Sequence, residues 1–533
     1  MTDESRVTAD LTAGSAPRRA ALGLPRRMAT NILTNYATVF LVAVAGLVTT
    51  PIMLKYLGVA EYGIWVLAGS VVGYLEILEL GFGTATTKLI AEDADKRTER
   101  VLRTLNTNVF VLTVMGFLAL IGGLVMSYYA PAWFNVPPDL ESATQKAFVI
   151  LTVAIAVSIP FDTFGGALNA YQRLDLLSLT NMWRALGAAI GGAVVAVLGG
   201  GVVAVTLVTA IFGMSAHLLR WRMLRRIIPG LRLSLRLVER AQIGLTAKLS
   251  WWFMLRDAAV VVTQRLDLVV VGVMLGLHAV AAYSIGLKLA QMGMKAMQPF
   301  SALFFPRASG LAAEGDVRGL GALLVDGTRV SLAVANPIML LLSILAWPLV
   351  VAWVGDGLGD AVPVLVLLAL ARGAASVAET AWWLLGGAGW IRWTASLSML
   401  EAAVNLGSSI LLAPVYGPAG VAAGTLIGVV LTRLPVSFVL SPRATGISPA
   451  KFAAGALRPH VAPVVVTALA LFLARSLIPP DPLPVLVTAG ASCALYWAVY
   501  LLTGAAPAER DRVRHLLTTS SHGVGRHRQG RGA

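Results

Sequence analysis

The sequence predicts an all-α polytopic membrane protein with about fourteen transmembrane helices, arranged as two pseudo-symmetric six-helix lobes plus two C-terminal helices. Of its 533 residues, 57% are hydrophobic and only 13% are charged, whereas a soluble domain carries about 25% charged residues. Apolar runs near the ~20 residues that a spanning helix needs recur from residue 30 to residue 503. Lysine and arginine gather in alternate loops, which is typical of a multi-pass topology.

Fourteen candidate spans account for the apolar runs. They begin near residues 32, 63, 105, 147, 178, 202, 256, 279, 328, 361, 392, 418, 460 and 484. With both termini cytoplasmic, the most basic segment, 220–248, lies inside, and the loop 128–146 lies outside. An odd number of spans would place basic loops on the outer side of the membrane, against the positive-inside rule. Richness in alanine, glycine, valine and arginine fits a bacterial source, so the expected location is the bacterial cytoplasmic membrane.

A weak internal repeat predicts the two lobes. The segments 201–207 and 420–426 agree at five of seven positions, 219 residues apart, and Arg173 matches Arg392 at the same offset. Because 219 residues hold six spans, the halves should share one topology about an axis along the membrane normal. The expected organisation is a disordered basic tail at 1–27, an N-lobe at 28–221, a basic cytoplasmic linker at 222–248, a C-lobe at 249–441, two further spans at 442–503 and a disordered basic tail at 504–533.

Several function classes are disfavoured by the same pattern. The net charge of +15 lies on tails and alternate loops, so we expect no nucleic-acid partner. The single cysteine, Cys493, excludes a disulfide framework, and no P-loop pattern occurs. The longest predicted outside loop offers only Asp139 and Glu141 as acids. The sequence therefore predicts no catalytic residues and no cofactor, and a polytopic enzyme of glycan assembly is the weaker alternative.

Two segments carry a family resemblance. The first is "TTPIMLKYLGVAEYGIWVLAGSVVGYLEILELGFGTATTKLIAE" (49–92), and the second is "RLDLVVVGVMLGLHAVAAYSIGLKLAQM" (265–292). The characteristic positions are Pro51, Leu57-Gly58, Tyr62-Gly63 and Glu79-Leu80-Gly81, together with Asp267. In this ordered set the chain resembles the polysaccharide flippases of the multidrug/oligosaccharidyl-lipid/polysaccharide exporter superfamily. Glu79 replaces the commoner aspartate of the motif.

The resemblance implies a V-shaped transporter. Such a protein would move an undecaprenyl-pyrophosphate-linked oligosaccharide from the inner to the outer leaflet for surface polysaccharide assembly, by alternating access. The implied partners are this lipid-linked oligosaccharide, membrane lipid, a coupling H⁺ or Na⁺, and polysaccharide polymerase or assembly proteins. A multidrug exporter of the same superfamily, coupled to a cation, is the main alternative.

Polar residues inside the spans are the candidate substrate contacts, because a charge in hydrocarbon is costly unless it faces water or a partner. At 100° per residue, Asp267 and Gln264 share one face of the seventh span, while Arg265 points away and is expected to pair structurally. On the eighth span, Lys288, Gln291 and Lys295 share a face. This stripe is either a cationic wall for an anionic head group or a row buried against acidic partners.

Further candidates lie on other spans. Arg372 is a plausible second phosphate contact. Glu76, Glu79 and Glu379 are possible proton or cation sites, although balancing the lysines is an equal alternative for them. Asp267 is expected to balance the lysine stripe when no substrate is bound, since an unpaired buried charge is destabilising.

Overall fold

The computed structural model describes residues 26–79, 82–93, 98–228, 230–240, 242–244, 246, 250, 265–295 and 298–505. These residues are helical apart from short connections. Ten helices among them are long and apolar enough to cross a membrane. The prediction of an all-α polytopic membrane protein is thereby confirmed. One of the ten, 37–77, covers the first two predicted spans, so the count of fourteen stays a prediction.

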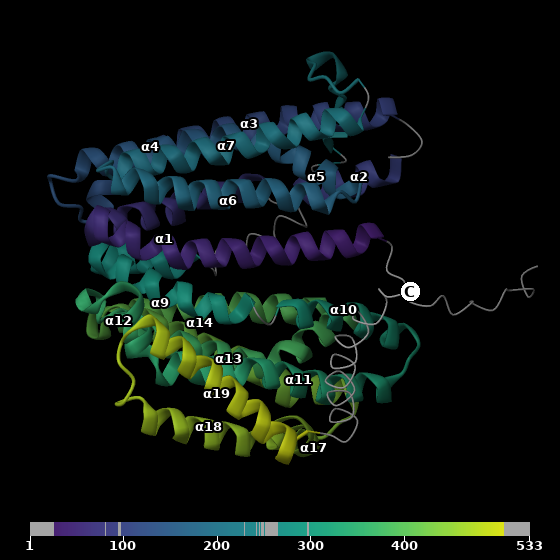
Figure 1. The fold of residues 1–533 in the computed structure, drawn as a ribbon. Coiled ribbons are helices and arrows are strands. Elements are labelled where there is room, and N and C mark those ends of the chain that lie inside the picture. Colours follow the sequence, from purple (N-terminus) through teal and green to yellow (C-terminus); the bar gives the residue numbers. More distant parts are fainter. Residues whose placement is uncertain are drawn as a thin grey trace, which may run out of the picture.

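The first half of the chain forms one helical bundle, the upper group of Figure 1, which we call the N-lobe. Its elements are α1 (Arg26–Val72), η2 (Gly73–Glu79), α2 (Phe82–Asp93), α3 (Thr98–Trp133), α4 (Glu141–Ser158), η3 (Ile159–Asp162), α5 (Thr163–Ala170), α6 (Leu174–Val197) and α7 (Val202–Ile227).

The long helix α1 is two helices joined at Gly58. This residue has φ 78° and ψ 168°, which are not helical values. Glycine adopts positive φ without the steric penalty that a Cβ brings, so the "LG" of the first sequence motif is the point where the chain turns. The two predicted spans that begin near residues 32 and 63 lie on either side of it.

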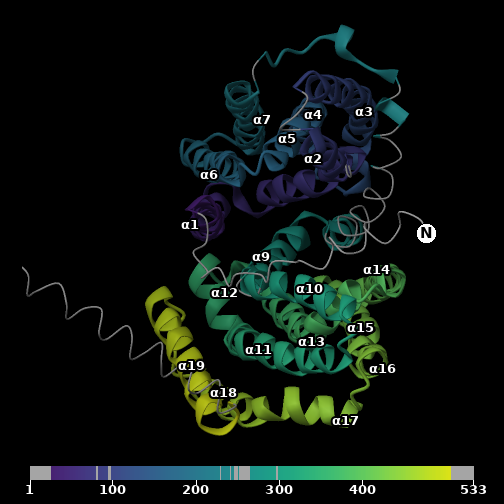
Figure 2. The ribbon, with the colours of Figure 1, turned by 90° about the vertical axis from the view of Figure 1, so that its right-hand side faces the viewer.

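The second half forms the C-lobe and two peripheral helices. After the helical segment 265–275 come α9 (Leu277–Lys295), α10 (Gln298–Ala313), α11 (Val317–Ile344), α12 (Ala346–Val354), η5 (Asp356–Leu358), α13 (Ala361–Gly387), α14 (Ile391–Tyr416), α15 (Pro418–Pro435), η6 (Val436–Leu440), α16 (Ser441–Thr445), α17 (Pro449–Phe452), η7 (Ala453–Leu457), η8 (Arg458–His460), α18 (Val461–Ala474) and α19 (Pro482–Thr503). Figure 2, which looks along the bundles, shows the N-lobe above the C-lobe, with α18 and α19 on the flank of the C-lobe.

The two lobes meet mainly through α1 and α9 (Figure 1). One apolar core runs through this contact and includes Tyr62 and Leu67 of α1 with Val280 of α9. The backbones approach closely, since a Cβ on Gly63 would lie 2.5 Å from the carbonyl oxygen of Leu277. Both residues lie near the predicted outer turns, so the lobes are packed together at that end.

The basic segment after α7 is fastened to the N-lobe. The side chain of Asn106 on α3 accepts a hydrogen bond from the backbone N–H of Ser234 at 2.7 Å and donates one to the carbonyl oxygen of Arg232 at 3.0 Å. Farther along, the hydroxyl of Thr107 accepts from the N–H of Glu239 at 3.0 Å. We call this set of contacts the α3 clasp. It holds the middle of the predicted interlobe linker, 222–248, against the N-lobe.

Candidate functional site

A lysine bridges the lobes at their junction. Lys288 on α9 donates hydrogen bonds to the hydroxyl of Tyr62 at 2.6 Å and to the hydroxyl of Thr50 at 3.1 Å, both on α1. Its ammonium nitrogen lies 5.1 Å from the ring centre of Tyr62 and 5.6 Å from that of Trp65. Lys288 is eleven residues into α9, about 16 Å along the helix. A cation therefore sits deep in the lobe junction, among aromatic rings and hydroxyl groups.

A second cation crosses between the lobes at Gly73. Arg265 forms a salt bridge of 2.6 Å with Glu76 of η2. Its guanidinium fills the space that a side chain on Gly73 would take, because a Cβ there would lie 1.2 Å from Nη1 of Arg265. The sequence predicts a structural pair for Arg265, and Glu76 is that partner.

Asp267 lies inside the C-lobe rather than beside Lys288. It is 7% exposed, and its Oδ2 atom accepts hydrogen bonds from Tyr283 at 2.8 Å and Thr425 at 2.9 Å. Within the described part of the chain, its Oδ1 atom has no hydrogen-bond partner. The contacts thus do not show Asp267 balancing Lys288, because the hydroxyl groups that hold it belong to its own lobe.

Further polar residues extend this cluster through the C-lobe. Asn405 donates to Thr425 at 3.1 Å. Glu401 accepts from Arg433 at 2.7 Å, and the Arg433 guanidinium lies 4.2 Å from the ring centre of Trp382. Arg372 lies within electrostatic reach of this group and of Asp267. The structure therefore brings two predicted site residues, Asp267 and Arg372, into one neighbourhood, separate from Lys288.

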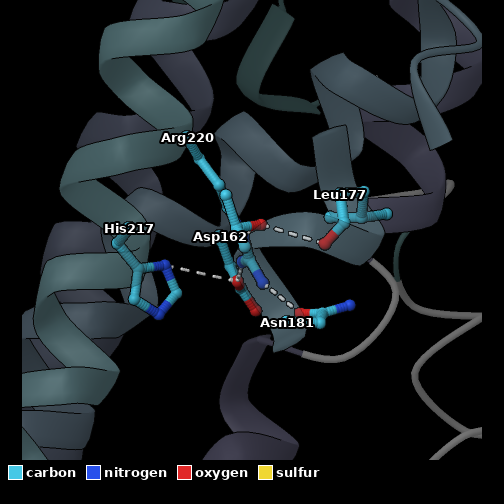
Figure 3. A network of polar contacts seen from close by, with 6 residues as sticks. Asp162, Leu177, Asn181, His217 and Arg220 are labelled. Carbon is cyan, nitrogen blue, oxygen red and sulfur yellow. Dashed lines mark hydrogen bonds and ion pairs between the residues drawn. The ribbon is translucent and has the colours of Figure 1, made fainter. Parts of the chain in front are cut away.

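The N-lobe holds its own charged network (Figure 3). Asp162, at the end of η3, accepts from Arg220 at 2.9 Å and faces Nδ1 of His217 at 3.6 Å. Arg220 is 7% exposed, and its remaining nitrogens donate to Asn181 at 2.7 Å and to Thr180 at 3.2 Å. We call these residues the N-lobe network. Figure 3 shows that they come from three separate elements, η3, α6 and α7.

Glu79 lies close enough to Asp162 for the two carboxyl groups to interact, so it adjoins the N-lobe network. Glu76, three residues earlier, instead faces Arg265. Both glutamates are candidates from the sequence, whereas Asp162, His217 and Arg220 are site residues that the sequence pattern did not predict. One signal was present for two of them, because His217 and Arg220 stand three residues apart in an apolar span and so share a helix face.

The remaining predicted residues are dispersed. Gln264 and the side chain of Lys295 lie outside the described residues. Gln291 is exposed on α9. Glu379 accepts a hydrogen bond from Trp383 of its own helix at 2.8 Å. Across the described residues, no three histidine, cysteine, aspartate or glutamate side chains gather as a metal site.

The fold defines the class of protein. The chain is similar to the lipid II flippase MurJ in its inward closed conformation, with a TM-score of 0.70 and 15% identity over 91% of this chain and 100% of that one. It is also similar to a multidrug transporter of the MATE family in its inward-facing conformation, with a TM-score of 0.65 and 14% identity over 76% and 95% of the two chains. The outward-facing conformation of a MATE family multidrug transporter is less similar, with a TM-score of 0.52 and 14% identity over 76% of this chain and 96% of that one.

This is the fold of a polytopic transporter of the MOP superfamily. The model of the family described as "Polysaccharide biosynthesis protein" matches residues 28–311, more than half of the sequence, and the chain belongs to that family. No curated protein sequence matches the chain. The fold is the one that these membrane transporters and the lipid II flippase share.

Proposed function

We propose that the protein is a flippase for an undecaprenyl-pyrophosphate-linked oligosaccharide repeat unit. It moves this lipid from the inner to the outer leaflet of the bacterial cytoplasmic membrane, by alternating access between the lobes. The observation that carries the proposal is Lys288 at the lobe junction. Among the described residues its hydrogen-bond acceptors are two hydroxyl groups and not a carboxylate. The alternative of a lysine buried against an acidic partner finds no support at this position.

The chemistry of the junction suits a diphosphate. A lysine ammonium is a compact charge on a flexible stem, so it can exchange a hydroxyl partner for a phosphate oxygen as the head group passes. Tyr62 and Trp65 beside it offer aromatic faces, which also suit the apolar faces of sugar rings. Arg372 in the C-lobe is the second cation assigned to the path in this proposal.

The lobes must separate and rejoin if access alternates. The Arg265–Glu76 salt bridge and the Lys288 hydrogen bonds both join one lobe to the other. These contacts must therefore break and re-form as the lobes move. A coupling H⁺ or Na⁺ is part of the proposal, with Glu76, Glu79 and Glu379 as its candidate carboxylates; Glu76 is paired with Arg265, so it is available only when that salt bridge opens. Assembly proteins would take over the delivered repeat unit at the outer leaflet.

Deletion of the gene, with analysis of lipid-linked intermediates, tests the substrate class. We expect complete repeat units to accumulate on the inner leaflet. Complementation with Lys288→Ala should fail although the protein reaches the membrane, and Lys288→Arg should restore part of the transport. Lys55→Ala is the matched control, because Lys55 is an exposed lysine on α1. Polymer export at the wild-type rate by Lys288→Ala would overturn the site assignment.

The exporter alternative makes the opposite prediction. Efflux of a cationic dye that depends on Glu79 or Glu379 and ignores Lys288 would identify a drug exporter. A disulfide between cysteines placed at Val59 and Leu277 on a Cys493→Ser background tests the geometry of transport in either case. We expect the crosslink to arrest transport, since the lobes pack together at this end, and full activity with the crosslink formed would exclude alternating access at these turns.

A further inference from the structure

A pocket opens on the side of the N-lobe, between the end of α4 and the middle of α7. Its volume is about 270 Å³. Its lining residues are Val157, Ser158, Phe161, Met214, Ser215, His217, Leu218 and Trp221. Most of this wall is apolar. A pocket of this composition favours hydrocarbon over water, since apolar cavities of similar size stay dry.

The pocket opens toward the bilayer. Val157, Met214 and Leu218 in its wall are 40%, 39% and 57% exposed. On α7 the exposed apolar residues Leu207 and Ile211 continue the same stripe at helical spacing. The pocket is therefore a recess in the surface that faces lipid tails. It is remote from the lobe junction, because α7 lies on the side of the N-lobe away from the C-lobe (Figure 2).

A cation stands at one rim of the recess, at the end of α7 that the predicted topology places on the cytoplasmic side. Trp221 lies nineteen residues into α7, so it is about 28 Å along the helix, near the far edge of a hydrocarbon core of about 30 Å. The guanidinium of Arg225 lies 5.1 Å from the ring centre of Trp221. Arg225 is exposed, as are Arg222 and Arg226. These arginines are placed for the head-group layer, directly beyond the apolar pocket.

We propose that this recess is a binding site for an anionic glycerophospholipid of the inner leaflet, with one acyl chain in the pocket and its phosphate paired with Arg225. A guanidinium binds a phosphate through two parallel hydrogen bonds, and its contact with the Trp221 ring holds it over the pocket. The lipid-linked substrate is not the occupant, because its head group must enter the lobe junction on the other side of the lobe.

The acyl chain in this site packs against a titratable group. His217 lines the pocket with one face and reaches Asp162 with its Nδ1 atom. The bound lipid therefore shields the N-lobe network from the membrane side and keeps His217 in place. The site does not depend on what the protein transports.

Photoactivatable lipids test the proposal on the full-length protein in nanodiscs. Three probes carry the reactive group in the chain: phosphatidylglycerol, phosphatidylcholine and undecaprenyl phosphate, each at the same low fraction. We expect phosphatidylglycerol to label residues 214–221 about fivefold more than phosphatidylcholine, because the choline of phosphatidylcholine neutralises its phosphate and one arginine gains about this factor from a net anionic lipid. Arg225→Gln should remove this preference. Arg226→Gln is the matched control. Arg226 is also exposed and lies beside Arg225 in the last turn of α7, so its replacement should leave the preference for phosphatidylglycerol intact.

Every other outcome overturns the proposal. Equal labelling by the two phospholipids removes the anionic selectivity, and an unchanged preference in Arg225→Gln removes the role of that arginine. Stronger labelling by undecaprenyl phosphate assigns the pocket to the substrate chain. A filling variant, Ser158→Leu, checks the pocket itself, because it should reduce labelling at residues 214–221 while labelling at α18 stays constant.

Discussion

The sequence repeat predicts one backbone plan for the two lobes, and their polar interiors differ. In the N-lobe, Asp162, His217 and Arg220 form a charged network. At the repeat offset of 219 residues from Asp162 and His217, the C-lobe has Ala381 and Val436, and both belong to a buried apolar cluster. The positions that the sequence repeat aligns thus belong to a charged network in the N-lobe and to a hydrophobic cluster in the C-lobe. If the sequence repeat reflects a duplication, each interior has since taken its own polar composition.

The C-lobe has its own polar cluster at a different place, which contains both the Glu401–Arg433 ion pair and a carboxylate, Asp267, that is held in another way. Arg220 of the N-lobe bonds directly to the carboxylate of Asp162. Asp267 of the C-lobe is held by hydroxyl groups, and one of its oxygens is without a partner among the described residues. Breaking a direct ion pair is strongly destabilising. A carboxylate with one unpaired oxygen can instead bind and release a proton or a cation. The comparison predicts that a change at Arg220 acts mainly on stability and a change at Asp267 acts mainly on transport.

The largest effect is expected for Arg220→Ala. Removing one partner of a buried ion pair costs about 3–5 kcal/mol, and we expect the low end because the Asp162 side chain is 36% exposed. The free energy of unfolding in detergent or the thermal midpoint measures it. Arg226→Ala, on the same helix but exposed, is the control. Equal stability of the two variants would show that the N-lobe network is not a stabilising pair.

Copying the C-lobe residues into the N-lobe should reverse most of that loss. The triple variant Asp162→Ala, His217→Val and Arg220→Val replaces the charged core by apolar side chains, and such exchanges are often neutral or stabilising. The free energy of unfolding of the triple variant is compared with that of Arg220→Ala. A triple variant no more stable than Arg220→Ala would mean that the N-lobe frame does not accept the apolar solution.

Asp267→Asn should change stability by about 1 kcal/mol or less, since the amide oxygen still accepts the hydrogen bonds of Tyr283 and Thr425. Transport should fall far more, and substrate binding should persist. Binding and turnover measured separately on reconstituted protein give the two quantities. Loss of folding without a specific loss of turnover would place Asp267 with the structural charges of the N-lobe.

The smallest effect is expected at the loop where the repeat aligns Arg173 with Arg392. Asp175 hydrogen-bonds Arg173 at 2.9 Å, and the C-lobe has Thr394 at the equivalent place. The hydrogen bond and charge of Arg173 lower the pKa of Asp175 below its usual value of about 3.9. A depressed pKa stabilises the folded protein above the unfolded pKa, and this contribution disappears as pH falls through the folded pKa.

Asp175→Thr should therefore lower the free energy of unfolding by at most about 1 kcal/mol near neutral pH, because the pair is partly exposed. The difference from the unaltered protein should shrink below pH ~4. Unfolding curves at several pH values measure this trend. A difference that grows in acid would contradict the assigned sign.

The sequence supported the fold more strongly than the site. Apolar runs, alternate basic loops and one repeat were enough for a polytopic helical protein, because these signals are local or periodic. Lys288 was selected from helical spacing, yet its partner Tyr62 lies 226 residues away. Arg265 was expected to pair, but Glu76 is 189 residues distant. Such partners depend on how two lobes dock, and the docking leaves no pattern within either segment.

The N-lobe network was missed for a related reason. Asp162 follows an interruption of the fourth predicted span, where α4 gives way to η3, and periodicity over a regular helix does not describe that turn. His217 and Arg220 are isolated polar residues in a long apolar run. Their meaning comes from a carboxylate 55 or more positions earlier in the chain, which only the folded bundle brings near.

The α3 clasp has a consequence for cutting the chain in two. Because Asn106 holds the backbone at Arg232 and Ser234, and Thr107 holds that at Glu239, the segment 230–240 belongs to the N-lobe. Fragments divided after residue 246 keep the clasp whole, so we expect them to reassemble when coexpressed. Fragments divided after Ile227 leave the N-lobe half with the polar groups of α3 unsatisfied and should be recovered poorly. The functional boundary between the halves therefore lies beyond the end of α7.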